Sequence, residues 1–521
     1  MTLRARWLGR VRYQDALALQ RGLFASGGRY LLLLEHPHVY TMGVRADPAH
    51  VLVDPASVGA ELVSADRGGD VTYHGPGQLV GYPIVDVPMG PDAIPSYVRS
   101  VEQLVIDVLA DVGLPGAARL PGYPGVWIGE RKICAIGVRV SRGRSMHGFA
   151  LNVDPDLSYF SHIVPCGIPD KQVTSLAAEG VPASMKEVVD AMVARAGTLW
   201  GPDVDRQDAA ILATSVRQRS TIDRSRTKVG EVGLELSARK PEWLRTKANM
   251  GPEFLELKRT MRSLDLVTVC EEAGCPNIFE CWGDGTATFM INGERCTRAC
   301  GFCLVDTRKP DALPDAMEPE HVAEAVARMG LAHAVITAVA RDDLPDGGAA
   351  QFAACVVAAR ARCPETSIEL LIPDCKGEPD ALDTVFASRP DVLNHNLETV
   401  LRLQRAVRPS ASYARSLAVL ARAKAAGLTT KSGIILGMGE NEDEVAGAMA
   451  DLRGVGVDIL TLGQYLRPSA AHLPVARWWT PDEFDNLRIV GESMGFAHVQ
   501  ASPLTRSSYH ARQAATAAQP Q

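Results

Sequence analysis

The sequence predicts two domains of different fold class: an α+β domain in the first half and an α/β domain with a parallel sheet in the second. The chain has 521 residues, more than one domain usually holds. In the second half, helix-like stretches with apolar residues at three- and four-residue steps alternate with short apolar runs, which favours parallel strands with helices outside. The first half lacks this alternation.

Individual elements follow from these patterns. In the first half we expect a strand at 31–35, an amphipathic helix at 96–113, and a strand ladder over 125–140 and 146–153 in which GERK forms a turn. In the second half, helices are expected at 318–329, 411–427 and 441–456, and strands at 334–339, 368–373, 391–397, 432–437 and 458–466.

Six of the eleven cysteines form two triads, spaced CxxxxCxxxxxC and CxxxCxxC. Their members are Cys270, Cys275, Cys281, Cys296, Cys300 and Cys303. A cubane iron-sulfur cluster takes four thiolates, so each triad leaves one iron for another ligand. We therefore predict two clusters. For the second triad, the iron without a cysteine ligand suggests a small molecule that chelates it. For the first triad, it suggests an unusual protein ligand or a cluster that is taken apart during the reaction.

Structural zinc and disulfides are the alternatives. Zinc prefers four protein ligands in paired units, and His321 and His333 lie at no such spacing. Residues 1–20 lack the apolar core of a signal peptide, so reduced cytosolic thiols are the better expectation.

The second triad reads CTRACGFC and resembles the radical S-adenosylmethionine (SAM) enzymes. That resemblance implies that SAM chelates the open iron and is cleaved to a radical that removes hydrogen from unactivated carbon. Phe302 would then pack against the adenine, or else belong to the core.

The first triad, with RSSY at 506–509, is similar to lipoyl synthase. This resemblance implies two 4Fe-4S clusters, with Ser508 as fourth ligand of an auxiliary cluster that supplies two sulfur atoms. It also implies a partial, six-unit (βα) barrel, with Arg341, Asp342 and Asp343 facing the reaction. It extends over 240–511 and includes GTATFMI, ARDDLPDGGA, NHNLETV, TKSGIILGMGE and QYLRPS.

Ser502 departs from that family, which usually has glycine there. Because glycine tolerates backbone angles that serine does not, this departure bears on the approach of the Ser508 loop to its cluster. Cys355, Cys363 and Cys375 are interpreted as small hydrophobic residues.

The first half carries four ordered motifs: RGGDVTYHGPGQ from Arg67, GERKICAIG, HGFALNV and PCGIPDKQVTSL. Over 31–176 they resemble the octanoyltransferases of the lipoate-protein transferase family, which share ancestry with lipoate and biotin ligases. Cys166 would be the nucleophile. Lys132 would lower the pKa of that thiol and shuttle the proton. The residues implied to bind substrate are Arg67, Gly68, Gly69, Asp70, Val71, Thr72, Tyr73, His74, Ala135, Ile136, Gly137, Gly148, Phe149 and Ala150.

Together these resemblances predict a natural or engineered fusion: an octanoyltransferase-like domain at 1–200, a linker and leading arm at 201–239, and a lipoyl synthase-like domain at 240–521. The chain would attach octanoate to a lipoyl domain and then insert two sulfur atoms. Alternatives are a lipoate ligase in front, a different sulfur-inserting radical enzyme behind, or a noncatalytic scaffold that carries clusters and binds lipoyl domains.

The net charge is −7 with both signs interspersed, which does not suggest nucleic acid. No apolar run approaches the roughly eighteen residues of a membrane span. We therefore expect a cytoplasmic protein. Its expected partners are octanoyl-acyl carrier protein, the lipoyl domains of 2-oxoacid dehydrogenases and the glycine cleavage H protein, an electron donor such as ferredoxin or flavodoxin, and a cluster-repair protein.

Overall fold

The computed structural model describes residues 2–165, 171–210, 233–234, 239–245, 267–268 and 277–518. The chain divides into two compact units, Met1–Ser215 and Val216–Gln521. Cys166, Cys270 and Cys275 lie outside the described residues, as does most of 201–239, so the position of the linker stays a prediction.

Unit 1 is built on a mixed sheet with strand order β12-β1-β2-β6-β10-β9-β8-β7, and β11 pairs with β9. The strands are β1 (Leu3–Arg10), β2 (Tyr30–Glu35), β6 (Gln78–Ile84), β7 (Ala118–Leu120), β8 (Tyr123–Ile128), β9 (Arg131–Ser141), β10 (Arg144–Asn152), β11 (Gln172–Val173) and β12 (Val204–Asp208). The predicted ladder is confirmed, because β8, β9 and β10 pair antiparallel in that order.

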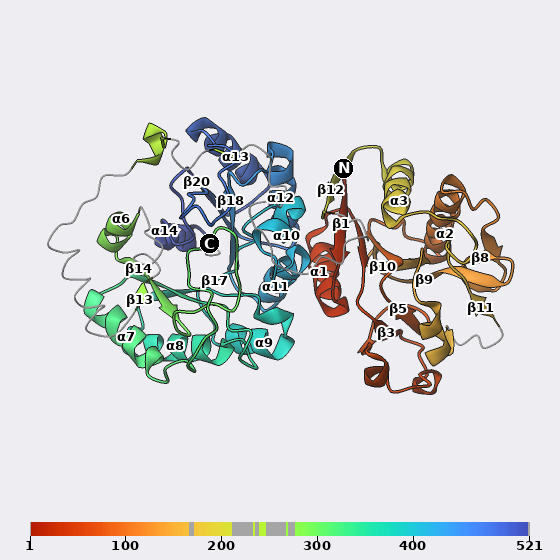
Figure 1. Ribbon diagram of the computed structural model, residues 1–521, viewed down its shortest axis with the longest axis horizontal. Helices are drawn as coiled ribbons and strands as arrows, with labels where there is room; N and C mark the ends of the chain where they lie inside the picture. The colour runs from red at the N-terminus through yellow and green to blue at the C-terminus, as the bar shows by residue number, and fades with distance from the viewer. Residues whose placement is uncertain are drawn as a thin grey trace. The chain divides into compact units, whose positions relative to one another are not determined.

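Three helices complete this sheet: α1 (Tyr13–Ser26), α2 (Ala93–Asp111) and α3 (Met185–Trp200). The last two share the main core with the strands, through residues such as Val105 on α2 and Val189 on α3. A smaller sheet, β4-β3-β5, stands beside it, with β3 at Val39–Met42, β4 at Glu61–Ser64 and β5 at Val71–His74. This arrangement, drawn in red to yellow in Figure 1, confirms the α+β prediction.

Unit 2 contains an eight-stranded sheet in sequence order, β13 to β20. Its strands are β13 (Val267–Thr268), β14 (Thr286–Ile291), β15 (His333–Ala338), β16 (Ser367–Leu371), β17 (Val392–Asn394), β18 (Thr430–Leu436), β19 (Ile459–Gln464) and β20 (His498–Ala501). Strands β14 to β20 pair in parallel, whereas β13 is antiparallel to β14. The parallel α/β prediction is therefore confirmed.

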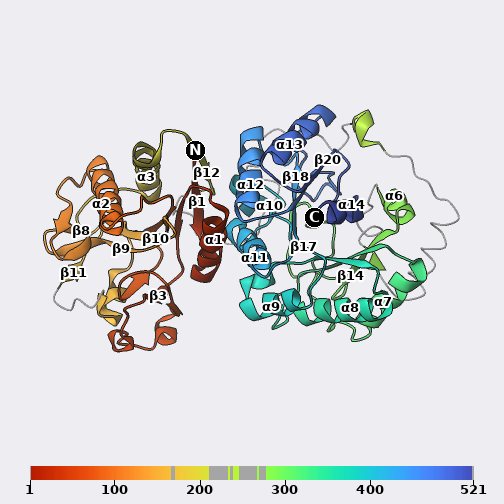
Figure 2. The same cartoon turned by 180° about the vertical axis from the view of Figure 1, so that it is seen from behind.

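Helices follow the strands and lie outside them in both views (Figures 1 and 2). They are α7 (Glu318–Met329), α8 (Ala349–Arg362), α9 (Pro379–Ala387), α10 (Gln404–Val407), α11 (Tyr413–Ala425), α12 (Glu442–Gly454) and α13 (Pro481–Ser493). Local sequence sets their ends: Asn441 and Glu444 form a capping box at the start of α12, and Gly330 ends α7 in the left-handed conformation.

The C-terminal helix α14 (Ala511–Ala517) differs, because it packs against the beginnings of two strands. Its Ala514 and Ala515 pack against Val392 and Ile459, the first residues of β17 and β19. In the part of the chain that the structure describes, no helix combines the length and apolar character needed to cross a membrane.

Candidate functional sites

Unit 1 contains a pocket between the main sheet and the smaller sheet. It brings together twelve of the fourteen residues that the sequence predicted to bind substrate: Arg67, Gly68, Gly69, Asp70, Thr72, His74, Ala135, Ile136, Gly137, Gly148, Phe149 and Ala150. These residues come from β5 and its preceding turn and from the paired strands β9 and β10.

The other two predicted residues, Val71 and Tyr73, face away from the pocket. Successive side chains of a strand point to opposite faces. On β5, Thr72 and His74 therefore line the pocket, while Val71 and Tyr73 join the core of the smaller sheet with Phe160.

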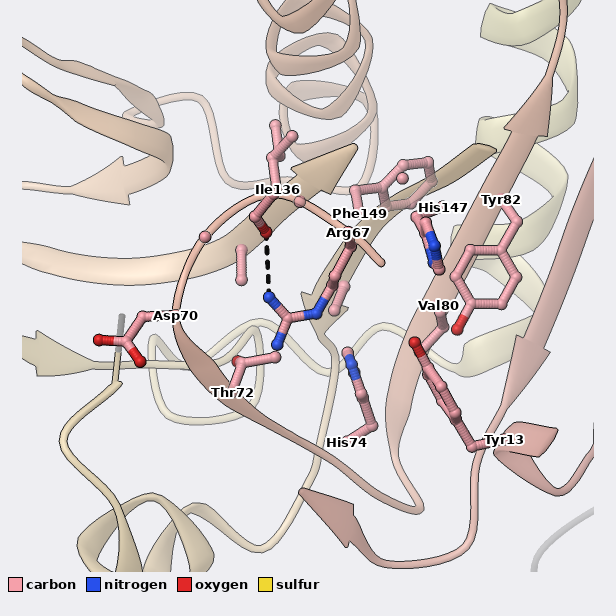
Figure 3. Close-up of a pocket in the computed structure, with 16 residues that line it drawn as sticks. Tyr13, Arg67, Asp70, Thr72, His74, Val80, Tyr82, Ile136, His147 and Phe149 are labelled. Atoms are coloured by element: carbon pink, nitrogen blue, oxygen red, sulfur yellow. Dashed lines mark hydrogen bonds between the residues drawn. The ribbon is translucent and has the colours of Figure 1, made fainter. Parts of the chain in front are cut away.

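Four further residues line the pocket: Tyr13, Val80, Tyr82 and His147. Figure 3 shows the rings of Tyr13, Tyr82 and His147 gathered at one end, with Asp70 and Thr72 at the other. His147 opens the HGFALNV motif, which could have indicated it. Tyr13 carried no such signal, because it begins α1, far away in sequence.

Burial keeps the rings of this pocket neutral. It lowers the pKa of His74 well below its usual value, and it raises the pKa of Tyr13 to about 12. The Nδ1–H of His74 donates to Gln78 Oε1 at 2.8 Å, which fixes the tautomer because that amide oxygen can only accept. Arg67 donates to the carbonyl oxygen of Thr41 at 2.5 Å. A pocket lined by buried, neutral rings suits an apolar chain.

Lys132 lies on β9 and is only 8 % exposed. Its Nζ stands 4.7 Å from the centroid of the Trp127 ring. Although Cys166 is outside the described residues, the chain after it returns to Lys132: β11 pairs with β9 so that Val173 stands opposite Lys132, and Thr174 N–H donates to the Lys132 carbonyl at 2.9 Å.

In unit 2, the second cysteine triad occupies a loop fixed to the ends of parallel strands. Cys296 N–H donates to Asp306 O at 2.8 Å, and Thr297 N–H donates to Ala340 O, just beyond β15, at 2.9 Å. Gly301 N–H donates to Val407 O at the end of α10. Carboxyl ends of parallel strands are where barrel enzymes place their chemistry.

The three thiols of this loop are half-buried, and thiolates are the protein ligands of iron-sulfur clusters. Burial raises the pKa of Cys300 and Cys303, the latter to about 11, and the neighbouring thiols of the triad raise both further. Across the described ranges, no three His, Cys, Asp or Glu side chains converge as ligands of one metal ion. In a cubane, each thiolate binds a different iron.

Arg298, inside the triad, anchors the loop. Its guanidinium donates to both carboxylate oxygens of Asp342, at 2.7 and 2.8 Å, and to Asp374 Oδ1 at 2.6 Å. Of the strand-end residues predicted to face the reaction, Asp342 thus holds the loop. Arg341 instead pairs with Asp343 and donates to Asn292 O.

The described member of the first triad, Cys281, lies on α6 (Ile278–Gly283), and the RSSY segment docks on that helix. The phenol of Tyr509 donates to both carboxylate oxygens of Glu280 at 3.2 Å, and His510 Nε2 lies 3.1 Å from the same group. The structure therefore brings the segment that carries Ser508 to the helix that carries Cys281.

Ser502 has an ordinary backbone conformation in this segment. It is not among the described non-glycine residues with positive φ. Its hydroxyl lies 2.8 Å from that of Thr505, and its N–H donates to Leu462 O. The backbone here does not require glycine.

Comparison with known proteins separates the two units. The lipoyl protein ligase A/B catalytic domain matches residues 12–196, the N-terminal domain of lipoyl synthase matches 200–275, and the radical SAM superfamily matches 290–452. The lipoyl synthase of Mycobacterium avium is 57% identical over 283 residues, which are 54% of this chain and 92% of that protein. The chain belongs to the lipoyl synthase family. The lipoyl synthase of Rubrobacter xylanophilus is 56% identical over 276 residues, covering 53% of this chain and 86% of that one.

Two solved structures are also similar. A bipartite lipoate protein ligase from Thermoplasma acidophilum is 22% identical, with a TM-score of 0.35, and covers 41% of this chain and 88% of its own. Streptococcus suis SuiB, bound to SAM, is 11% identical, with a TM-score of 0.33, covering 46% of this chain and 56% of its own. The lipoyl synthase matches thus occupy one half of the chain, and a lipoate ligase or transferase domain occupies the other.

Proposed function

We propose that this member of the lipoyl synthase family is bifunctional. Its first unit transfers octanoyl from octanoyl-acyl carrier protein to a lysine of a lipoyl domain, and its second unit inserts two sulfur atoms into that chain. The docking of the Ser508 segment on the Cys281 helix carries the proposal for sulfur insertion. The pocket formed by the predicted substrate-binding residues supports acyl transfer.

In the first unit, the Cys166 thiolate attacks the carrier thioester, the carrier thiol leaves, and an acyl-enzyme forms. The amine of the target lysine then displaces Cys166 and gives up its proton. Lys132 stabilises the thiolate as a cation and passes the proton on. The neutral pocket around His74 and Tyr13 holds the acyl chain away from water.

In the second unit, Cys296, Cys300 and Cys303 would hold the SAM-binding cluster, and Cys270, Cys275, Cys281 and Ser508 the auxiliary cluster. When bound, these groups supply a low-potential electron, a hydrogen-abstracting radical and sulfur. The chain's own residues position that chemistry. Arg298 fixes the loop of the second triad to the residues that follow β15 and β16. Glu280 fixes the segment that carries Ser508 to α6.

The two activities are consecutive, so joining them has a kinetic consequence. The product of the first unit is the substrate of the second, and a tether raises the local concentration of one site near the product of the other. We further propose a cytoplasmic location. The expected partners remain lipoyl domains of 2-oxoacid dehydrogenases and the glycine cleavage H protein, ferredoxin or flavodoxin, and a cluster-repair protein.

The test is the intact mass of a lipoyl domain after anaerobic incubation with reconstituted protein, octanoyl-acyl carrier protein, SAM and a low-potential reductant. We expect the octanoyl mass first and the doubly sulfurated mass later. A parallel reaction with free lipoate and ATP distinguishes the competing ligase activity. Modification only in that second reaction would contradict the transferase proposal, and a stop at the octanoyl mass would contradict sulfur insertion.

A further inference from the structure

The segment leading to Ser508 crosses the carboxyl ends of β17 and β19. Gln464 N–H, at the end of β19, donates to Pro503 O at 3.2 Å. A Cβ at Gly463 would stand 2.1 Å from Thr505 O, so only glycine lets the segment lie this close to the strand. These contacts fix residues 503–505 to the end of β19, just before Ser507 and Ser508.

The first serine of RSSY, Ser507, is hydrogen-bonded to a residue of the NHNLETV motif. Asn396, just after β17, donates from Nδ2 to Ser507 Oγ at 2.9 Å and to Glu398 Oε1 at 3.1 Å. Arg408 in turn donates to the Asn396 carbonyl at 3.1 Å. Asn396 is 7 % exposed, so its side chain has little freedom to leave Ser507.

Hydrogen bonds connect the backbone around Asn396 to the SAM-binding loop. Val407 O accepts the N–H of Gly301 in that loop at 2.8 Å, and Arg408, the next residue, donates to the carbonyl oxygens of Asn396 and Leu397 at 3.1 and 3.0 Å. Glu398 has φ of +68° and its N–H donates to Gly433 O, so its backbone is fixed in a conformation that glutamate rarely adopts. The connection Ser507–Asn396–Arg408 therefore leads from the auxiliary-cluster segment to Val407, which binds the SAM-binding loop.

We propose that Ser507 is a positioning residue: through Asn396 it fixes the distance between the sulfur donor beside Ser508 and the site where the substrate radical forms. This inference rests on the proposed sulfur insertion. A substrate radical reacts productively only if the donor is within reach, because misplacement of about 1 Å can cost two orders of magnitude in rate. Ser507 thus determines how many SAM molecules are cleaved for each lipoyl group made.

Ser507→Ala tests this role, with Ser507→Thr retaining the hydroxyl and Ser493→Ala, on the exposed end of α13, as matched control. The readouts are 5′-deoxyadenosine and lipoyl product from a pre-octanoylated lipoyl domain. In Ser507→Ala we expect SAM cleavage near the wild-type rate, but about five times more 5′-deoxyadenosine per product, the factor that one lost hydrogen bond gives. Ser507→Thr should restore the wild-type ratio. An unchanged ratio, or a parallel fall of both products, would overturn the proposal.

A second readout does not depend on turnover. Amide hydrogen exchange of 502–511 should be faster in Ser507→Ala than in wild type or Ser493→Ala, and equal exchange in all three would overturn the proposed link. In the Asn396→Ala background, adding Ser507→Ala should change neither exchange nor product ratio further. Additive effects would show that Ser507 does not act through Asn396. If the wild type makes no lipoyl product while Ser507→Ala still loosens the segment, the proposed function fails and the link stands.

Discussion

Tyr509 and Glu280 are 229 residues apart in sequence, yet the phenol of one donates to both carboxylate oxygens of the other at 3.2 Å. Each stands next to a residue that the sequence predicted to bind the same auxiliary cluster, Ser508 and Cys281. The contact therefore brings the Ser508 segment and the Cys281 helix, which are distant in sequence, into direct contact.

Removal of this contact should impair sulfur insertion but not SAM cleavage. Glu280→Ala takes away the acceptor for Tyr509 and the partner of His510, so the Ser508 segment loses its attachment to α6. We expect about ten-fold less lipoyl product per 5′-deoxyadenosine, because both contacts involve a charged group. Glu492→Ala, which removes an exposed ion pair with Arg488, is the control and should match wild type. Equal loss of SAM cleavage would contradict this prediction.

Acyl transfer should depend on the Lys132 amine. Lys132→Met keeps the length and much of the packing on Trp127 but removes the cation beside the returning β11 segment. We expect octanoyl transfer to fall at least a hundred-fold, in the range of general acid–base catalysis. Lys186→Met, on the exposed surface of α3, is the control. The rate is measured by intact mass of the lipoyl domain.

Cys166→Ala should likewise abolish octanoyl transfer, because the acyl-enzyme cannot form. The same variant should still insert sulfur into a pre-octanoylated lipoyl domain, since the two sites lie in separate units. Mass spectrometry of both reactions checks this. Loss of both activities would rule out separable sites.

The acyl pocket should not tolerate a methyl group at Gly148. A Cβ there would stand 2.1 Å from Gly81 O on the neighbouring strand β6, and backbone cannot move aside without disturbing the pairing. We expect Gly148→Ala to lose stability by roughly 1–3 kcal/mol and to lose most of its acyl transfer. Gly116→Ala is the matched control, because a Cβ at Gly116 meets nothing within 4 Å. Urea unfolding and the transfer assay test both variants.

The stability of unit 1 should fall as the pH falls below about 7. Burial lowers the pKa of His36 from 6.5 to about 4. Between these values the unfolded chain binds a proton that the folded chain does not, so stability is present above pH 6.5 and is lost toward pH 4. The loss from His36 is about 3 kcal/mol. Urea unfolding followed by tryptophan fluorescence at several pH values should show a smaller fall in His36→Gln. An identical fall would contradict the assignment to His36.

Arg298 should contribute to the stability of unit 2 even without bound cofactors. Arg298→Met leaves the carboxylate of Asp374, which is fully buried, without its closest cation. Breaking one partner of a buried ion pair costs about 3–5 kcal/mol. Arg308→Met removes an exposed cation from the same loop and should change thermal unfolding little. A similar effect of both substitutions would contradict this role.

The sequence alone determined the fold class of both halves and most of the candidate chemistry. Apolar periodicity placed α7 at the residues where it occurs, because a helix that covers a parallel sheet must repeat its buried face every three to four residues. The spacing of the cysteines gave both triads, since each lies in one short segment, whereas Ser508 and the twelve predicted residues that line the unit 1 pocket came from family resemblance.

Only the tertiary structure decided which side chains meet across long separations. Strand alternation on β5 turned Val71 and Tyr73 away from the pocket, and the start of α1 brought Tyr13 into it. Asn396 reached Ser507 because parallel strands end at one edge, where segments distant in sequence converge. A local sequence pattern indicates which face of a helix or strand a residue occupies. Which other residue it contacts depends on how the whole chain packs.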